Sequence, residues 1–232
     1  MRSFKTEAII LARTNYGEAD RIMTFLTPDH GKVKAIAKAV RKSKSKLAGG
    51  LELFSVSNLT LVIGRGEINT VISTQLKSYY GNIASDLDRT ELGYRFIKLI
   101  DNNTEASCDN GYFYLLQRAF AALNDSQLKP ELINLWFNMA LLRLSGHAPN
   151  LYSDVNGSKL LDSASYDFAH ERMHFVPKLA NEGIYNANHI KFLRLGFAAD
   201  GPNSLAKVTK AAELVEDLDS LIAQMLKIYL RT

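Results

Sequence analysis

The hydrophobic pattern of this chain changes its period near residue 80, and this change constrains the fold more than any other feature. Before that point, short runs rich in Val, Ile, Leu and Thr alternate with turn sequences containing Gly, Pro, Asn and Asp, which is typical of β-strands joined by tight turns. The five runs cover residues 7–14, 21–27, 32–40, 51–63 and 67–77. Five short strands favour a closed barrel, because closure removes exposed sheet edges. We therefore expect an OB-fold, with an SH3-like barrel as the alternative.

After residue 82 the apolar residues recur at the spacing of helices. Ser85, with Asp88 three residues later, predicts the start of a first helix, and Gly146 predicts the end of a later one. We expect the further helices near 110–124, 130–145 and 187–199, and a last helix whose apolar face carries Val215, Leu218, Ile222, Met225 and Tyr229.

The resulting fold class is α+β, with an OB-fold barrel domain over residues 1–80 and a helical domain over residues 81–232. Residues 147–183 interrupt the helices with Gly, Pro, Asn and Ser, and this composition predicts a loop region with a hairpin, inserted into the helical domain.

The positive charge of the chain is concentrated in its first third. Residues 1–80 contain 13 Lys and Arg against 6 Asp and Glu, a balance of +7, whereas residues 81–232 contain 15 against 18, a balance of −3. This segregation is typical of a protein that binds a polyanion, most commonly nucleic acid. The alternative is a solvated surface on which the charges cluster by chance.

Composition also predicts where the protein is found. No apolar stretch approaches the roughly 20 residues that a membrane helix needs, and the first residues lack the apolar run of a secretion signal. Cys108 is the single cysteine, so an internal disulfide and a multi-cysteine metal site are excluded. We expect a cytoplasmic, nucleoid-associated protein without a membrane partner, and an exposed, unreactive Cys108 thiol.

The strongest chemical feature is a run of cations at residues 38–46, called here the basic loop. It contains Lys38, Arg41, Lys42, Lys44 and Lys46, and no acidic residue occurs between positions 32 and 50. Flexible cations bind phosphates by neutralising charge and releasing counterions, without recognising bases. A loop that only aids solubility, binds a membrane or acts as a targeting signal is the alternative.

Residues near the basic loop extend the predicted site. Lys32, Lys34 and Lys38 have the same parity along the predicted strand and so project from one face. Tyr16, in a predicted turn, is the best-placed aromatic residue for stacking on a base. The candidate DNA-binding residues are Arg41, Lys42, Lys44, Lys46, Lys38, Lys34, Lys32, Arg21, Arg65 and Tyr16.

The same part of the chain resembles a known family. The segments that carry the resemblance are Tyr-Gly-Glu-Ala-Asp-Arg-Ile at 16–22, Thr-Phe-Leu-Thr-Pro at 24–28, His-Gly-Lys-Val at 30–33 and Ser-Lys-Ser-Lys-Leu-Ala-Gly-Gly-Leu-Glu-Leu-Phe at 43–54. They are similar to the opening of the RecO family of recombination mediators, and Gly-His-Ala-Pro-Asn-Leu at 146–151 follows in the family's order.

The resemblance implies an N-terminal OB-fold, a helical domain and a role in recombinational repair. It implies binding to single- and double-stranded DNA, annealing of complementary strands and partnership with RecR. It also implies help in loading the RecA recombinase onto DNA coated by single-strand binding protein. No reaction is catalysed in this role, and no cofactor is expected.

One departure from the family concerns zinc. Many members follow the Gly-His/Tyr-x-Pro-x-Leu stretch with two Cys-x-x-Cys pairs that bind zinc, whereas residues 152–157 here are Tyr-Ser-Asp-Val-Asn-Gly. Ser, Asp and Asn cannot replace four thiolates in a structural tetrahedral site. We predict a degenerate zinc module without metal, held by packing and hydrogen bonds or else mobile.

The sequence His-Glu-Arg-Met-His at 170–174 matches the H-E-x-x-H motif of zinc peptidases, in which two His one helical turn apart bind zinc and the Glu activates water. Pro177 follows closely, so a long supporting helix is not expected, and Glu213 is a possible but unsupported distant third ligand. A zinc-dependent hydrolase at this stretch is kept as one alternative function. A protein-docking OB module with little DNA affinity is the other.

Overall fold

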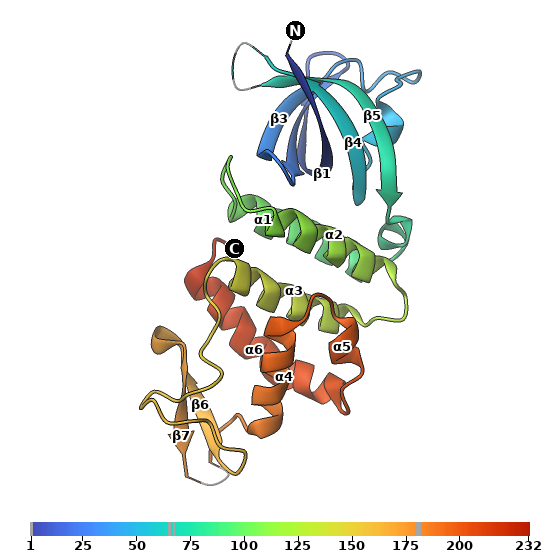
Figure 1. Cartoon of the computed structure of the whole chain (residues 1–232). Coiled ribbons are helices and arrows are strands. Elements are labelled where there is room, and N and C mark those ends of the chain that lie inside the picture. Colours follow the sequence, from blue (N-terminus) through green and yellow to red (C-terminus); the bar gives the residue numbers. More distant parts are fainter. Residues whose placement is uncertain (1, 65, 67, 180–181) are drawn as a thin grey trace. The chain divides into compact units, whose positions relative to one another are not determined.

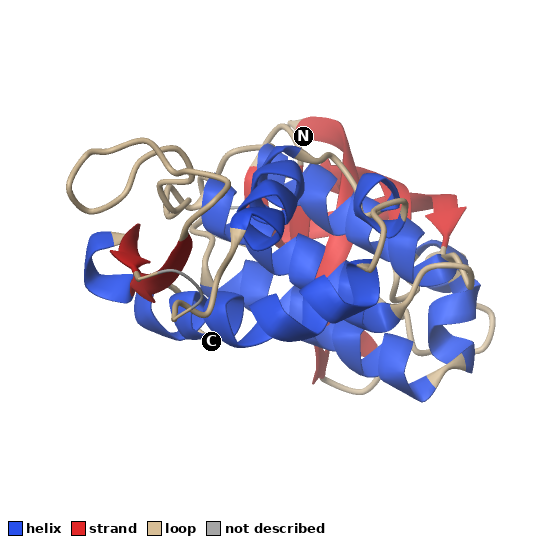
Figure 2. Cartoon of the chain, turned by 90° about the horizontal axis from the view of Figure 1, so that it is seen from below, coloured by secondary structure: helices blue, strands red, loops and turns tan. Residues whose placement is uncertain are grey.

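The computed structural model describes residues 2–64, 66, 68–179 and 182–232. The chain forms two compact units, Met1–Ser126 and Gln127–Thr232. Figure 1 labels the helices and strands, and Figure 2 distinguishes them by colour. Secondary structure changes from strands to helices near residue 80, as expected, but the first two helices belong to the same compact unit as the strands. The prediction of an α+β chain with an N-terminal five-stranded OB-like sheet is confirmed.

Five strands form the barrel in the order β1-β2-β3-β5-β4, and β4 pairs with β1 to close the ring. The parallel pairing of β3 with β5 joins the meander of the first three strands to the last two. The bounds are Ser3–Tyr16 for β1, Asp20–Thr27 for β2, Gly31–Ala37 for β3, Ser55–Val62 for β4 and Asn69–Tyr79 for β5.

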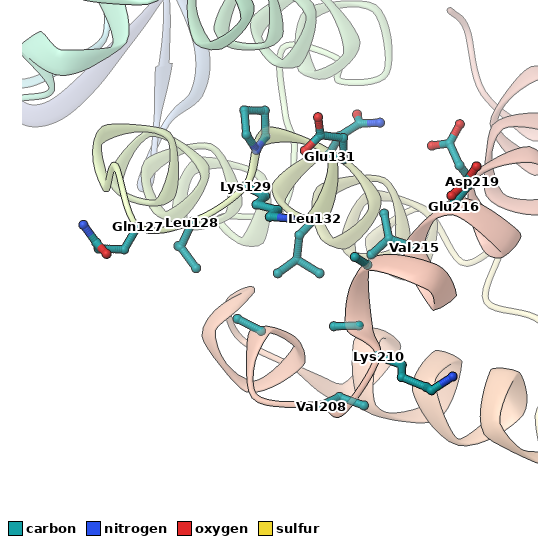
Figure 3. Close-up of a pocket in the computed structure, with 15 residues that line it drawn as sticks. Gln127, Leu128, Lys129, Glu131, Leu132, Val208, Lys210, Val215, Glu216 and Asp219 are labelled. Atoms are coloured by element: carbon teal, nitrogen blue, oxygen red, sulfur yellow. The ribbon is translucent and has the colours of Figure 1, made fainter.

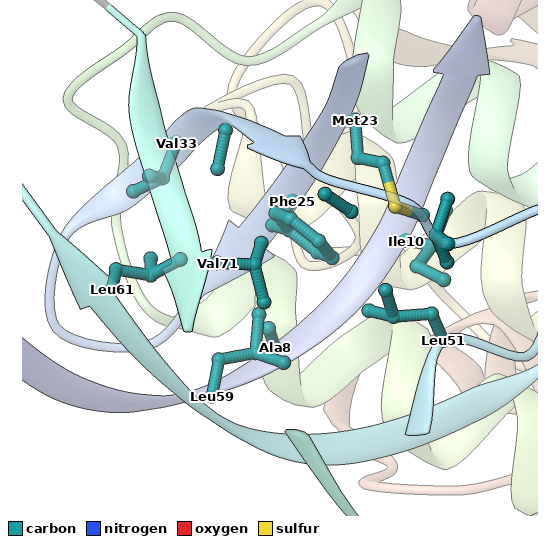
Figure 4. Close-up of a cluster of buried hydrophobic side chains, with 12 residues drawn as sticks. Ala8, Ile10, Met23, Phe25, Val33, Leu51, Leu59, Leu61 and Val71 are labelled. Carbon is teal, nitrogen blue, oxygen red and sulfur yellow. The ribbon is translucent and has the colours of Figure 1, made fainter. Parts of the chain in front are cut away.

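The interior of the barrel is filled by the inward-facing residues of all five strands (Figure 4). Along β3, Val33, Ala35 and Ala37 are buried, whereas Lys34 is exposed. This alternation is the period of two that the sequence predicts for a strand with one face in the core. Two residues outside the strands, Val40 and Leu51, belong to the same core.

Two predicted strands are shorter in the structure. The run 32–40 ends as a strand at Ala37, and the run 51–63 becomes a strand only at Ser55. Ala39 has a φ of 55°, in the left-handed region that side-chain-bearing residues seldom adopt. The chain therefore leaves the sheet there, although Val40 is apolar and fits a strand pattern. The predicted strand failed at this point because Val40 enters the core from a turn.

Helices α1 (Leu87–Asn102) and α2 (Gly111–Asn124) complete the first unit, after the short 3-10 helix η2 (Gly81–Ser85). Asp86, and not the predicted Ser85, caps α1, because its side chain accepts a hydrogen bond from the backbone N–H of Arg89. The ring of Phe54 lies edge-on to Phe120 of α2 at 5.5 Å between centroids. A Cβ at Gly93 would lie 2.6 Å from Phe54, so α1 packs closely because it has a glycine there.

The second unit is built on α3 (Pro130–Leu144), α4 (Ala187–Ala198) and α6 (Ala211–Tyr229), with the one-turn helix α5 (Asn203–Ala206). Both α4 and α6 pack on α3. Gly146 has a φ of 79° directly after α3, as expected for a residue that ends a helix. Strands β6 (Ser165–Ala169) and β7 (His174–Lys178) form a hairpin between α3 and α4. Of the helices in the described ranges, none has the length and apolar character to cross a membrane.

Candidate nucleic-acid interface

The basic loop is anchored to the barrel by apolar residues within it and after it. Val40 is 6% exposed and Leu51 is 4% exposed, and both pack into the barrel core. Between them, Leu47 packs partly against this core, and its carbonyl accepts a hydrogen bond from Thr74 Oγ1 of β5 at 3.1 Å. A Cβ at Gly50 would fall 2.4 Å from the same hydroxyl, so only glycine allows this approach. The loop is thus an anchored segment whose polar residues lie between apolar contacts.

The cations of the basic loop face solvent. Arg41, Lys42, Lys44 and Lys46 are all exposed, as is Lys38 where the chain leaves β3. Within the part of the chain that the structure describes, none of these five side chains forms an ion pair or a side-chain hydrogen bond. Their positive charge is therefore available to an external anion, and no internal bond has to break for phosphate to bind.

The β1–β2 hairpin lies beside the basic loop. The backbone N–H of Arg41 donates to the carbonyl of Ala19 at the hairpin tip at 3.0 Å. Arg21 pairs with Ala37 across β2 and β3, and its Nε donates to Asn15 Oδ1 at 3.2 Å. This bond orients the guanidinium and leaves its terminal nitrogens for another acceptor. The predicted residues Arg21 and Tyr16 are therefore near the loop, and the Tyr16 ring is 55% exposed.

The two lysines of β3 have different surroundings. Lys32 Nζ lies 2.6 Å from Asp101 Oδ1 and also donates to the carbonyls of Asp101 and Thr104, at 2.8 and 3.1 Å. These acceptors belong to the C-terminal end of α1, where a cation is stabilised by the helix dipole. Lys32 thus ties the barrel to α1, whereas Lys34 is exposed. Arg65 lies outside the described residues.

Arg13 is a further candidate that the sequence analysis missed. It is exposed near the end of β1, opposite Met23, and so lies diagonally across the strand pair from Arg21 on the same face. Its position depends on a register shift between Ile10 and Ala12. A bulge of this kind leaves no mark in the residue pattern, so only the paired strands reveal that Arg13 and Arg21 are neighbours.

Comparison with known proteins finds two family descriptions that together cover almost the whole chain. The family description "Recombination protein O N terminal" covers residues 1–80, and "Recombination protein O C terminal" covers residues 84–230. The chain belongs to the recombination protein O (RecO) family. Its relatives include a protein named DNA repair protein RecO from Dehalococcoides mccartyi strain 195, which is 35% identical over 94% of this chain and 87% of the relative. The RecO of strain CBDB1 is 32% identical over the same shares, and that of Alkaliphilus metalliredigens is 33% identical over 66% of this chain and 62% of the relative.

The H-E-x-x-H stretch of this RecO-family chain does not form an α-helix. His170 to Arg172 form a single 3-10 turn, Met173 is left-handed with a φ of 54°, and His174 begins β7. The two His side chains therefore do not lie one turn apart on a helix, which is the arrangement that zinc peptidases need. His174 Nε2 instead lies 3.1 Å from Asn150 Nδ2. This geometry contradicts the alternative of a zinc-dependent hydrolase at residues 170–174.

The segment at residues 147–183, called here the lobe, is the region that the sequence predicts to be a degenerate zinc module. Asp154 Oδ1 accepts hydrogen bonds from the backbone N–H groups of Asn156 and Ser158, at 2.8 and 2.9 Å. Asn150 Oδ1 accepts hydrogen bonds from the backbone N–H groups of Tyr152 and Ser153, both at 2.9 Å. Side-chain oxygens thus hold the two turns of the lobe. Over the described ranges, no three His, Cys, Asp or Glu residues gather as a metal site.

An aromatic cluster fills the interior of the lobe. Phe175 is fully buried and contacts the rings of Tyr166, Phe168 and Tyr185, with centroids 5.1 to 6.1 Å apart. Burial raises the pKa of Tyr185, and the carboxylates of Asp167 and Asp217 raise it further. The lobe is therefore packed around its own apolar centre, as one of the two sequence-based alternatives expects.

A groove of about 1140 Å³ crosses the second unit between the start of α3 and the α5–α6 region. Leu132 and Val215 line it, as Figure 3 shows. Glu131, Glu216 and Asp219 also line it, and its two cations are Lys129 and Lys210, of which Lys210 is paired with Glu213 at 3.0 Å. The groove thus carries more uncompensated negative than positive charge.

Cys108 differs from the expectation of an exposed thiol. It is partly buried, close to the turn before β3, where a Cβ at Gly31 would lie 3.1 Å from its backbone nitrogen. Burial raises the pKa of the Cys108 thiol, against a smaller opposite effect of Lys32. A raised pKa lowers the thiolate fraction at neutral pH, so the thiol is less reactive than a free one.

Proposed function

We propose that this chain is a DNA-binding recombination mediator, whose basic loop and β1–β2 hairpin bind the phosphates of single- and double-stranded DNA. The observation that carries the proposal is the set of five exposed cations from Lys38 to Lys46, on a loop anchored in an OB-like core. Among the residues that the structure describes, none forms an ion pair with these cations. Relatives of the chain are named DNA repair proteins, which supports a role in repair.

The chemistry of the proposed site favours phosphate over bases. Lys side chains on a loop act as mobile point charges, and Arg21 and Arg13 add planar guanidinium groups that bind two phosphate oxygens at once. Contacts to phosphate fix the strand but carry no sequence information. Tyr16 is placed to stack on an unpaired base, which is also independent of sequence. We propose Arg13 as an addition to the predicted residues, and Lys32 as a structural lysine outside the interface.

Annealing follows from the same arrangement. Cations that screen phosphate repulsion allow two strands to approach, and the base edges stay free to pair because no side chain occupies them. We therefore propose that the chain anneals complementary strands, without catalysing a covalent reaction.

Further partners are proposed on the family relationship alone. They are RecR, single-strand binding protein and, indirectly, the RecA recombinase during loading onto coated DNA. An acidic tail would not suit the groove of the second unit, because Glu131, Glu216 and Asp219 would repel it. That groove therefore lends no support to the single-strand binding protein contact.

The test is a titration of a fluorescent single-stranded oligonucleotide at several salt concentrations. The variant has Arg41, Lys42, Lys44 and Lys46 all changed to Ala. We expect weaker binding, and a dependence of log affinity on log salt that is shallower by up to about 3, since each phosphate contact to a single strand contributes about 0.7. The control variant removes four exposed lysines of the second unit, namely Lys129, Lys159, Lys207 and Lys227.

The control separates local from general electrostatics. Both variants lose the same net charge, so a general effect of charge weakens binding equally in the two. The proposal requires that the plot of log affinity against log salt concentration becomes shallower for the loop variant alone. If the wild-type protein does not bind at low salt, DNA binding through this surface is refuted, and the protein-docking OB module becomes the better hypothesis. Double-stranded DNA is tested in the same way.

A further inference from the structure

An acidic side chain lies within the proposed DNA-binding surface. Asp20 is the first residue of β2, next to Arg21. Its Oδ1 accepts a hydrogen bond from the backbone N–H of Ala39 at 2.7 Å. In the described part of the chain, Asp20 forms no ion pair with a cation. The carboxylate is thus bonded to the backbone of the basic loop, although the cation Arg21 follows it directly in the sequence.

The residue that Asp20 holds has an unfavourable conformation. Ala39 has a φ of 55°, in the left-handed region where a Cβ is crowded. Such a conformation persists only where surrounding contacts impose it. At Ala39 the chain turns from β3 into the loop, so that Val40 enters the core and Arg41 faces solvent. The Asp20 bond therefore stabilises the turn that sets the direction of the loop.

A second bond joins the same two segments. The backbone N–H of Arg41 donates to the carbonyl of Ala19, one residue before Asp20, at 3.0 Å. The loop then continues with a hydrogen bond from the N–H of Lys42 to the carbonyl of Ala39 at 3.2 Å. Residues 19–20 and 39–41 thus form a two-point connection between the hairpin that carries Arg21 and the loop that carries the other cations.

We propose that Asp20 is a positioning residue for DNA binding: its carboxylate holds the Ala39 turn so that the hairpin and the basic loop present their cations to one phosphate strand. This inference rests on the proposed function. In this role an acidic residue favours the binding of a polyanion, because a fixed loop loses less conformational entropy on binding than a free loop does.

The sign of the effect separates positioning from simple electrostatics. Asp20→Ala and Asp20→Asn both remove a negative charge, which by itself strengthens binding to DNA. Only Asn keeps a side-chain oxygen that can accept the Ala39 N–H. We expect several-fold weaker binding and a shallower salt slope for Asp20→Ala, by about 0.7 for each cation that leaves the strand. For Asp20→Asn we expect affinity equal to or above that of the wild-type protein.

Two measurements need no DNA. Amide hydrogen exchange of Ala39 should be slow in the wild-type protein and in Asp20→Asn, and fast in Asp20→Ala. Limited proteolysis with trypsin should cut residues 41–46 faster in Asp20→Ala alone. Thermal unfolding followed by circular dichroism identifies the temperature range in which all three proteins are folded. The titrations are done within that range.

Each outcome decides one of the two proposals. Failure of the wild-type protein to bind refutes the proposed function, while the exchange and proteolysis results still report on the Asp20 connection. Equal or tighter binding of Asp20→Ala overturns the positioning role. So does weaker binding of both variants, since it would mean that the charge itself is required, and so does rapid exchange of Ala39 in the wild-type protein.

Discussion

The basic loop and the lobe both lie outside the barrel strands and the long helices, and they use their polar side chains differently. Val40 within the basic loop and Leu51 after it are buried in the barrel core, and the cations between them face solvent. In the lobe, Asn150 and Asp154 direct their side chains to the lobe's own backbone. Polar groups without internal partners are available to a ligand, whereas polar groups bonded to their own backbone are used for structure.

This difference explains why one segment is a candidate binding site and the other is not. Cations that already pair with carboxylates, such as Lys178 with Asp167 at 3.1 Å in the lobe, gain less from a phosphate because the existing pair must be broken. Lys178 also lowers the pKa of the Asp167 carboxyl. The cations of the basic loop have no such competitor among the described residues.

The largest expected effect is on the stability of the lobe. Phe175→Ala removes a fully buried ring from the contacts with Tyr166, Phe168 and Tyr185. We expect a loss of about 3–5 kcal/mol in the free energy of unfolding, from lost burial and the cavity left behind. Urea denaturation followed by fluorescence measures it, and DNA affinity at low denaturant should not change.

Leu179→Ala serves as the matched control for Phe175→Ala. Its side chain is apolar and lies in the same lobe, but it is 74% exposed, so we expect a change within about 0.5 kcal/mol. Equal stability of Phe175→Ala and the wild-type protein would show that packing around Phe175 does not hold the lobe.

A variant with a smaller expected effect on stability, Asp154→Ala, tests the side-chain hydrogen bonds of the lobe. Asp154 is 7% exposed, and Asp154→Ala leaves the N–H groups of Asn156 and Ser158 without their acceptor. We expect a loss of about 1–3 kcal/mol in the free energy of unfolding, because two hydrogen bonds to a charged acceptor are lost. Asp154→Asn keeps the accepting oxygen and should recover most of the lost free energy of unfolding. Urea denaturation of the two variants measures the difference. A loss of the same size in both would contradict the role of these bonds.

Local patterns in the sequence predicted the parts of the fold that depend on neighbouring residues. The alternation Val33, Lys34, Ala35 identifies β3, and the cations from Lys38 to Lys46 identify the basic loop, because each pattern lies within a few residues. The H-E-x-x-H match also lies within a few residues, but it does not determine secondary structure, and the stretch proved to be a turn between two strands.

Contacts between distant residues could not be predicted. Lys32 bonds to Asp101 and Thr104, about seventy positions away, and nothing near Lys32 distinguishes it from Lys34. The Asp20–Ala39 bond likewise depends on the pairing of β2 with β3. A single sequence does not indicate which of several exposed-looking lysines will meet a helix end, because that depends on how the helix packs.

The smallest expected effect is the response of the lobe to a metal chelator. The side-chain oxygens of Asn150 and Asp154 already accept backbone N–H groups at the two turns, and residues 152–157 supply no thiolate. A structural zinc site needs four ligands, and its loss unfolds the segment that it holds. We therefore expect the same melting temperature with and without EDTA, and no stoichiometric zinc by elemental analysis of the purified protein. One equivalent of zinc, together with a lower melting temperature in EDTA, would show that the lobe is held by metal and that its hydrogen bonds alone are insufficient.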